Sequence, residues 1–519
     1  MELADIFIIL MVVATGAFLL CGYPVAFTLA GTALIFAVLG IAADLIELRD
    51  ILLYPDRIFG TMSNDVLLAV PLFVFMGIML ERSRVAEDLL ESMSYLLRRV
   101  RGGLGISVAL VGAMLAASTG IVGATVVAMG LISLPTMLRH GYDKSLASGS
   151  IAAAGTLGQI IPPSIVLILL GDVLTTEYTN VRRELGDSAI HAISVGHLFA
   201  GALLPGFGLL LLYVLYQGAV AVFQPHKAPP HGEAEEGRDL HILSSFLPAF
   251  GLIVAVLGSI LAGIATPTEA ASVGAVGAMF LASLRLGDGA KWPVQAGVIS
   301  IILLLILNQT LDLRLGRVDV STADQAGMVF AGLLCFLIGV AVLHSIKQIL
   351  SNDVLASVVR STAETSSMVF IILIGASLFS LVFISFGGEE AVRAVLESLP
   401  GGTAGAILAV MLVMFILGFF LDFIEITFVV VPIVAPALLL MGVDPVWLGV
   451  MMAMNLQTSF LTPPFGFALF YLRGVAPDSV RTGDIYRGVI PFVGIQIVAL
   501  ILLAIFPEIA TWLPDQVFE

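Results

Sequence analysis

The sequence predicts an all-α polytopic membrane protein whose two halves repeat one pattern of helices in opposite orientations. Three observations carry this prediction. The chain of 519 residues is 59% hydrophobic and only 12% charged, whereas soluble domains carry about 25% charged residues. Apolar runs long enough to cross the ~30 Å hydrocarbon layer recur throughout the chain. Adjacent prolines interrupt two of these runs, at Pro162–Pro163 and at Pro463–Pro464.

Composition also excludes several classes of protein. The formal net charge is −15, and no basic stretch carries interleaved aromatic residues, so nucleic acid is not an expected partner. Cys21 and Cys335 both lie in apolar segments, which predicts packing residues rather than a disulfide. The N-terminal segment has acids where a secretory signal peptide has basic residues, so we expect it to be a retained first span.

Each proline pair marks a point where one membrane helix stops and another starts. Two adjacent prolines remove two backbone donors, and unpaired backbone groups are costly in hydrocarbon. The carbonyl groups freed before the first pair, such as that of Gly158, suit a cation, and the helix start at Ser164 suits an anion. A kink used only for packing is the alternative, but the presence of two such pairs favours a binding site.

The second half of the chain repeats the first at a constant offset. An offset of 301 residues relates Pro135, Gly141, Asp143 and Pro162 to Pro436, Gly442, Asp444 and Pro463. Several features that recur in the same order indicate an internal repeat.

Charged segments in the two halves predict opposite orientations. Segment 81–102 is amphipathic and carries five arginines, whereas its counterpart 387–402 carries one arginine and three glutamates. Basic residues favour the cytoplasmic side, so we expect an inverted repeat. Inverted repeats are typical of secondary transporters, whose binding site lies near the midplane. A tandem duplication in a single orientation is the alternative.

The chain divides into five predicted regions. These are N-terminal scaffold spans (1–60), a first repeat (61–223), a polar loop (224–244), linking scaffold spans (245–350) and a second, inverted repeat (351–519). The linking region includes an insertion of extra spans at about 285–345. The short apolar stretch 67–80 suits one arm of a re-entrant hairpin, with 366–384 as its counterpart. A polar loop is expected at about 175–194.

Small and oxygen-bearing residues near the breaks are the candidate ligands, because hard cations such as Na⁺ take oxygen ligands. The Na⁺ candidates are Ser118, Thr119, Gly120, Thr125, Thr156, Gly158, Asp422, Asn455, Thr458 and Thr462. The solute candidates are Pro162, Pro163, Ser164, Pro463, Pro464 and Gly466. Close packing of small residues is the alternative for 117–125. An arginine partner or a position at the water boundary is the alternative for Asp422.

At six places the sequence resembles the large membrane subunit of tripartite ATP-independent periplasmic (TRAP) transporters, the DctM family. The motifs are PLFVFMG (71–77), STGIVGAT (118–125), P-x5-GYD (135–143), GTLGQIIPPSI (155–165), FLDFIEI (420–426) and LTPPFG (461–466). The resemblance covers about 1–270 and 350–510. Two features depart from the family pattern. Ser118-Thr119-Gly120 stands where a Ser-Gly-Ser type sequence is usual, and 285–345 has no counterpart.

The resemblance implies an elevator-type transporter, in which two hairpins and two broken helices slide against a scaffold, driven by a Na⁺ gradient. It implies a small four-helix membrane subunit of the DctQ type, a periplasmic substrate-binding protein of the DctP type and a location in the bacterial inner membrane. Its ion and solute residues correspond here to Ser118, Thr119, Gly120, Thr156, Pro162, Pro163, Asn455, Thr458, Pro463 and Pro464.

We therefore predict the permease subunit of a Na⁺-coupled, binding-protein-dependent importer of small organic anions, with no cofactor and no enzymatic activity. We also expect membrane lipid as a partner of this subunit. The sequence contains no Walker motif, so ATP hydrolysis is not the predicted energy source. A stand-alone divalent-anion/Na⁺ symporter, an integral membrane enzyme and a channel are the alternatives.

Overall fold

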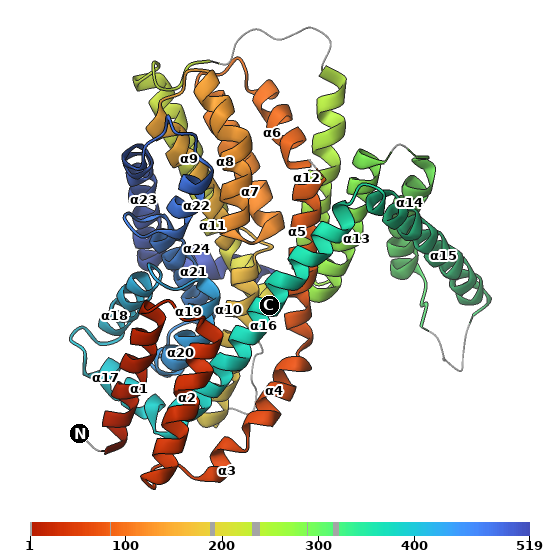
Figure 1. Ribbon diagram of the computed structural model, residues 1–519. Helices are drawn as coiled ribbons and strands as arrows, with labels where there is room; N and C mark the ends of the chain where they lie inside the picture. The colour runs from red at the N-terminus through yellow and green to blue at the C-terminus, as the bar shows by residue number, and fades with distance from the viewer. Residues whose placement is uncertain are drawn as a thin grey trace.

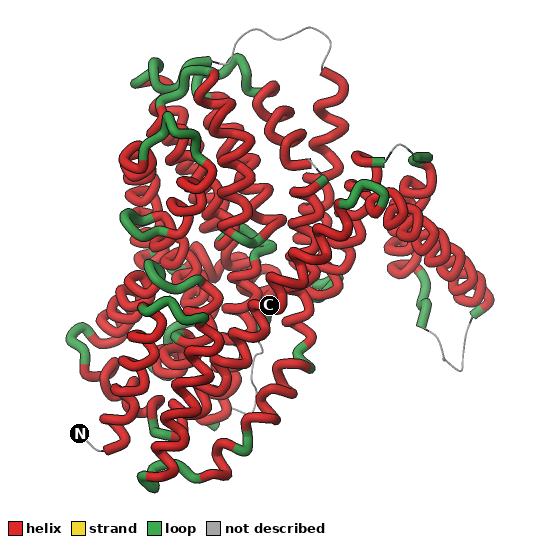
Figure 2. Tube along the Cα trace, viewed as in Figure 1, coloured by secondary structure: helices red, strands yellow, loops and turns green. Residues whose placement is uncertain are grey.

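The computed structural model describes residues 3–83, 85–186, 193–230, 239–287, 289–314 and 321–518. Within these ranges every regular element is a helix (Figure 2). Among these residues, 9 helices are long and apolar enough to cross a membrane, and 3 bent helix pairs pass the same test. The prediction of an all-α polytopic membrane protein is confirmed.

One group of helices, which we call the scaffold, combines N-terminal and central parts of the chain. Its members are α1 (Leu3–Leu20), α2 (Val25–Ala42), α3 (Leu48–Ile51), α4 (Tyr54–Met62), η1 (Asp65–Leu68), α5 (Ala69–Arg82), α12 (Asp239–Leu261), α13 (Pro267–Leu286) and α16 (Val354–Ser385). Helix α2 packs against α16, and α5 packs against both α13 and α16. These contacts hold the helices together as one layer of the molecule (Figure 1).

The stretch 67–80, predicted as a hairpin arm, belongs instead to a bent scaffold segment. The chain passes from α3 and α4 into η1 and α5 with a bend of 50°, and it continues in one direction rather than turning back (Figure 1). Its counterpart 366–384 is the second part of α16, a helix of 32 residues. The prediction was wrong because a short apolar run also results when a bend divides a longer span.

The two amphipathic segments form short helices, as their periodicity indicates. These are α6 (Val85–Leu96) and α17 (Gly388–Ser398). Helix α17 is bent by 118° from the helix that follows it, α18 (Gly402–Leu417). A bend of this size turns α17 away from the direction of the spans, as expected for a helix at the membrane surface.

Two re-entrant hairpins enter from opposite ends of the molecule. Hairpin 1 consists of α7 (Gly103–Thr119) and α8 (Val122–Arg139), and hairpin 2 consists of α18, α19 (Phe423–Val429) and α20 (Val431–Leu440). Hairpin 1 occupies the upper half of Figure 1 and hairpin 2 the lower half. The predicted inverted repeat is therefore confirmed.

Each hairpin is followed by a broken helix. In the first half, α9 (Lys144–Thr156) and the 3₁₀ turn η2 (Leu157–Gln159) lead to α10 (Ile165–Glu184); in the second half, α21 (Pro445–Leu461) leads to α22 (Phe467–Val475). We call 160–164 the first break and 462–466 the second break. Helix α10 continues to Glu184, so the predicted polar loop at about 175–194 was wrong over its first half.

Three further helices complete the repeat core, the name we give to the hairpins and broken helices together with α11 (Val195–Phe223), α23 (Thr482–Ile505) and α24 (Glu508–Phe518). Helix α23 packs against α9, and α24 packs against α11. The last helices of each repeat therefore pack against the other repeat, and both repeats form one body.

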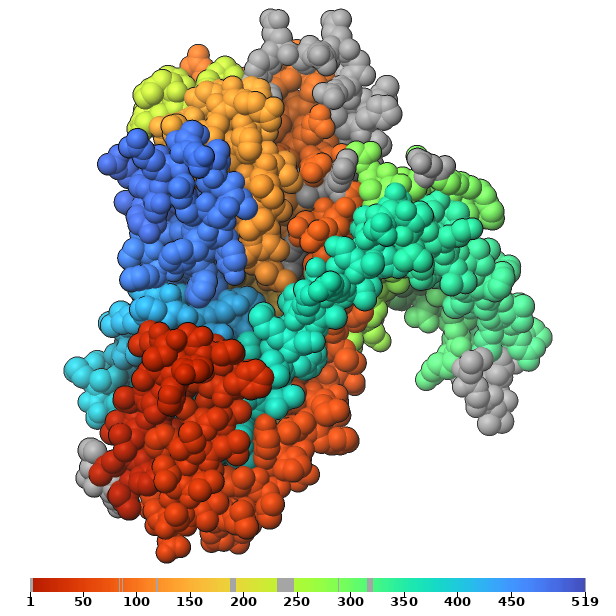
Figure 3. All heavy atoms as spheres, in the orientation of Figure 1, coloured from red at the N-terminus to blue at the C-terminus, as the bar shows by residue number. Residues whose placement is uncertain are grey.

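The predicted extra spans at about 285–345 form two helices that project from the body. They are α14 (Trp292–Thr310) and α15 (Thr322–Leu350). They pack against each other, and α15 also packs against α13 (Figures 1 and 3). Their main contacts are with each other, with α13 and, for α15, with α16, which places both helices outside the repeat core.

Candidate functional site

The two breaks and the two hairpin tips meet around one pseudo-two-fold axis. Helix α8 of hairpin 1 packs against α22, and α10 packs against α19 and α20 of hairpin 2. The side chain Nε2 of Gln457 lies 3.5 Å from Thr156 Oγ1, and these two residues are 301 positions apart. A residue that contacts its own repeat counterpart lies next to the symmetry axis. The midplane arrangement of inverted-repeat transporters is therefore present.

The tip of hairpin 1 lies directly on the start of α10. Gly120 ends α7 with a φ of 62°. A Cβ atom added to Gly120 would lie 2.7 Å from Ile165 Cγ1 and 3.1 Å from Ile165 N. Only glycine tolerates both the left-handed backbone and this close approach. The side chains of the Na⁺ candidates Ser118 and Thr119 lie outside the described residues, but the turn that carries them adjoins the first break.

At the tip of hairpin 2, two acids cap a helix. Asp422 Oδ1 accepts from Phe423 N at 2.7 Å, and Glu425 Oε2 accepts from Asp422 N at 3.0 Å. This capping box explains why two acids three residues apart occur at mid-depth. The capping bond uses one carboxylate oxygen of Asp422, and an ionised carboxylate has further lone pairs for a cation.

The first break is a buried loop with an internal hydrogen bond. All of residues 160–165 are buried. Ser164 Oγ donates to Gln159 O at 3.0 Å, so this hydroxyl is engaged within the loop. The amide side chain of Gln159 is fully buried, and neither of its polar atoms has a hydrogen-bond partner among the described side chains. A buried amide in this state calls for a water molecule or an ion beside it.

Polar side chains of α21, just before the second break, hold hairpin 2. Asn455 Nδ2 donates to Met411 O at 2.8 Å, and Ser459 Oγ donates to Phe415 O at 2.7 Å. Both acceptors lie on α18. A Cβ atom added to Gly466 would lie 2.4 Å from Phe460 O. The tight turn at this position therefore requires glycine.

Four threonine candidates donate their hydroxyl protons to backbone carbonyls of their own helices. The donors Thr125, Thr156, Thr458 and Thr462 reach Ile121, Ala153, Met454 and Thr458 at 3.1, 2.9, 2.8 and 2.7 Å. A hydroxyl that donates in this way keeps its oxygen lone pairs, which are the groups that a cation binds. The candidate set thus suits Na⁺. The described residues hold no cluster of three or more His, Cys, Asp or Glu for a transition metal.

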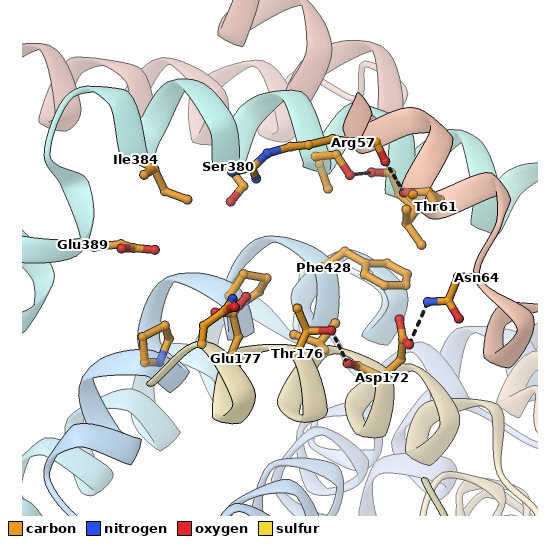
Figure 4. Close-up of a pocket in the computed structure, with 18 of the residues that line it drawn as sticks. Arg57, Thr61, Asn64, Asp172, Thr176, Glu177, Ser380, Ile384, Glu389 and Phe428 are labelled. Atoms are coloured by element: carbon orange, nitrogen blue, oxygen red, sulfur yellow. Dashed lines mark hydrogen bonds between the residues drawn. The ribbon is translucent and has the colours of Figure 1, made fainter. Parts of the chain in front are cut away.

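A cavity of about 610 Å³ lies between the scaffold and the repeat core (Figure 4). One wall carries Arg57 and Thr61 of α4 and Ser380 of α16, and the facing wall carries Asp172 and Glu177 of α10. The cavity therefore follows the boundary between the two groups of helices over much of the length of α10.

Polar contacts lie along this cavity. Asn64 Nδ2, just before η1 of the scaffold, donates to Asp172 Oδ1 of the repeat core at 2.8 Å. Arg393 Nη1 of α17, a helix that we assign to neither group, lies 3.9 Å from Glu184 Oε1 of α10. On α17, burial raises the pKa of the Glu389 carboxyl, nearby carboxylates raise it further, and Arg57 lowers it.

The cavity was not predicted, although the sequence of α10 carries a signal for it. Asp172, Thr176, Asn180 and Glu184 line it from α10. They are spaced four residues apart, which places them on one face of a helix. The expectation of a loop from about 175 concealed this spacing.

The inverted hairpins and broken helices define the chain as a membrane transporter of the inverted-repeat class. A family model described as "Tripartite ATP-independent periplasmic transporter, DctM component" matches residues 10–310 and 286–509. The chain belongs to this family, which confirms the resemblance seen in its motifs.

Curated relatives match over nearly the whole chain. The C4-dicarboxylate TRAP transporter large permease protein DctM of Vibrio cholerae is 28% identical, with 96% of this chain and 95% of the relative covered. The ectoine TRAP transporter large permease protein TeaC of Halomonas elongata is 26% identical, with 98% and 99% covered. The sialic acid TRAP transporter large permease protein SiaM of Vibrio cholerae is 22% identical, with 96% of each covered. These relatives are transporter permeases, so the chain is a transporter subunit and not an enzyme.

Among solved structures, the fold is similar to that of the Alcanivorax borkumensis YdaH transporter. The TM-score is 0.54 at 14% sequence identity, and the match covers 89% of this chain and 88% of that chain. At this identity the similarity concerns the fold alone.

Proposed function

We propose that this permease subunit imports small organic anions together with Na⁺ by an elevator movement of the repeat core against the scaffold. The observation that supports this proposal most directly is the meeting of both breaks and both hairpin tips around one axis, marked by the contact between Thr156 and Gln457. Discontinuous helices at mid-depth offer backbone carbonyls to a cation and helix starts to an anion.

The boundary between scaffold and repeat core supports the elevator part of the proposal. Asn64–Asp172 crosses it, and the 610 Å³ cavity separates its walls over part of its area. An open space along a boundary between two groups of helices leaves room for one group to slide past the other.

The solutes after which the relatives are named support an organic acid as the solute of this chain. C4-dicarboxylates, ectoine and sialic acid each carry a carboxylate group, and their permeases match this chain almost end to end. We propose a small membrane subunit and a periplasmic substrate-binding protein as partners, and the bacterial inner membrane as the location.

Uptake by the reconstituted transporter is expected to require both Na⁺ and the binding protein. Each Na⁺ that crosses 100 mV supplies about 2.3 kcal/mol, and no other energy source is proposed for the chain. The experiment uses proteoliposomes that hold this chain with its proposed small membrane subunit. It measures uptake of labelled succinate, ectoine and sialic acid with and without the proposed substrate-binding protein.

Replacement of external Na⁺ by K⁺, or omission of the binding protein, is expected to lower uptake to that of empty liposomes. Uptake that persists without the binding protein would support the stand-alone symporter instead. Uptake that is indifferent to Na⁺ would remove the coupling ion from the proposal.

A further inference from the structure

The cavity between scaffold and repeat core has a row of polar side chains on each wall. The scaffold row consists of Arg57 and Thr61, one turn apart on α4, and of Asn64 just after that helix. The row on α10 consists of Asp172, Thr176, Asn180 and Glu184. Figure 4 shows Arg57 and Thr61 on one side of the cavity and Asp172 and Thr176 on the other. The two rows therefore face each other across the boundary.

Asn64 joins the two rows. Its Nδ2 donates to Asp172 Oδ1 at 2.8 Å, and its Oδ1 accepts from Val66 N at 2.9 Å. The second bond fixes the orientation of the amide, so Nδ2 is held toward α10. Thr268 Oγ1 of α13 donates to Asp65 O at 2.7 Å, which ties the turn that carries Asn64 to the scaffold. Asn64 is therefore a fixed donor on the scaffold, and Asp172 is its acceptor on the repeat core.

The residues before and after Asp172 on its face of α10 differ in polarity. Ile168, about one turn earlier, is 0% exposed. Thr176 and Asn180, about one and two turns later, are exposed and line the cavity. A movement of the core that brings these later turns to Asn64 replaces one polar partner with another. A movement in the opposite direction would set the Asn64 amide against an apolar side chain, which is costly because a buried amide without a partner loses its hydrogen bonds to water.

Arg57 lies in the same register. It is close enough to Glu177 and Glu389 to act on them electrostatically. Glu184 follows Glu177 on α10 at about the same interval at which Asn180 follows Asp172. This interval is about two helical turns, or roughly 11–12 Å along an α-helix. One shift of this length would therefore give both Asn64 and Arg57 a new polar partner.

We propose that the polar face of α10 is a track with two register positions for the repeat core. In the first position, which this structure shows, Asn64 binds Asp172. In the second position, Asn64 binds Asn180, and Arg57 faces Glu184 in place of Glu177. Shifts of whole helical turns between two discrete packings are a known form of conformational change. This inference rests on the proposed elevator movement and gives it a direction and a length, because the core moves along α10 toward the N-terminal end of that helix by roughly 12 Å.

Disulfide cross-linking tests the track with three double variants, in which Asn64→Cys is combined with Asp172→Cys, Asn180→Cys or Ile168→Cys. Cys21 and Cys335 are both free and exposed, so the prediction that they are packing residues was wrong, and both are first replaced by serine. Apolar residues of a membrane protein also face lipid, which explains the error. The complete transporter in liposomes is oxidised with copper phenanthroline. The thiols that remain are then counted in the unfolded protein with a maleimide-polyethylene glycol reagent.

The double variants with Asp172→Cys and with Asn180→Cys are both expected to form the disulfide at least tenfold faster than the variant with Ile168→Cys, which is the matched control one turn in the opposite direction. Absence of either expected disulfide would overturn the track. A disulfide with Ile168→Cys that forms as fast as the one with Asn180→Cys would also overturn it, because the movement would then have the opposite direction or no preferred direction. This comparison needs no uptake, so it decides the track even where a variant does not transport.

Uptake by the variant with Asn64→Cys and Asp172→Cys separates this inference from the proposed function. Its disulfide is expected to lower Na⁺-driven uptake at least tenfold, and dithiothreitol is expected to restore the level measured before oxidation. Uptake that persists while the disulfide is formed would overturn the elevator movement of the proposed function. A reversible block of uptake without a disulfide between Asn64→Cys and Asn180→Cys would overturn the track alone.

Discussion

Gly120→Ala is expected to lower Na⁺-driven uptake by roughly tenfold or more, since a tenfold change corresponds to about 1.4 kcal/mol. A left-handed conformation costs an alanine roughly 1–2 kcal/mol. The added methyl group would also meet Ile165 Cγ1 at 2.7 Å, and overpacking of this kind costs about 1–3 kcal/mol. The tip of hairpin 1 would then move away from the start of α10, and the oxygens that it brings to the first break would move with it.

Gly22→Ala is the matched control for this variant. Gly22 has a φ of +84°, and nothing lies within 4 Å of a Cβ atom added there. Both variants therefore carry the backbone cost, but only Gly120→Ala carries the clash with Ile165. Uptake and protein level are measured in parallel in the same membranes. Normal uptake by Gly120→Ala at a normal protein level would mean that the close approach of hairpin 1 to α10 is not needed for transport.

Asp422→Asn is expected to raise the Na⁺ concentration for half-maximal uptake at least tenfold, a loss of about 1.4 kcal/mol in ion binding. Asparagine is as good a helix N-cap as aspartate, so the bond from Phe423 N to the side chain of residue 422 is retained. What the variant removes is the negative charge next to the second break. The measurement is the Na⁺ dependence of the initial uptake rate at a saturating solute concentration.

Asp444→Asn separates ion binding from capping. Asp444 caps α21 by accepting from Trp447 N at 2.8 Å, the same role that Asp422 has for α19. It lies at the opposite end of α21 from the second break, and its replacement is expected to leave the Na⁺ dependence unchanged. If both variants shift the Na⁺ dependence equally, Asp422 acts only as a cap.

The breaks and the repeat were predictable because they leave local signals. Two adjacent prolines in an apolar run interrupt a helix, and an offset of 301 residues is visible without coordinates. Two of the family motifs, at 155–165 and 461–466, contain the breaks, so the class of protein could be predicted from the sequence. The positions of the hairpins did not follow, because run length does not distinguish a re-entrant arm from a bent span. A better signal was the glycine pair before each hairpin, with Gly102 and Gly401 at φ of 74° and 98°.

The unequal cover of the two breaks had no signal in the sequence. Pro162–Pro163 and Pro463–Pro464 both interrupt apolar runs. Gly206 of α11 lies against Ile160 and Ile161 of the first break, whereas Tyr486 of α23 bonds Pro464 of the second and leaves Phe465 exposed. Burial at such positions is a property of distant parts of the chain, which a local pattern does not contain.

The bond between Thr156 and Gln457 bears on the origin of the molecule. Two identical subunits related by a dyad can place only like against like at that point, threonine against threonine or glutamine against glutamine. A single polypeptide that contains both halves escapes this restriction and sets a short hydroxyl against a long amide. Covalent fusion of the halves thus permits two dissimilar side chains to meet at the symmetry axis.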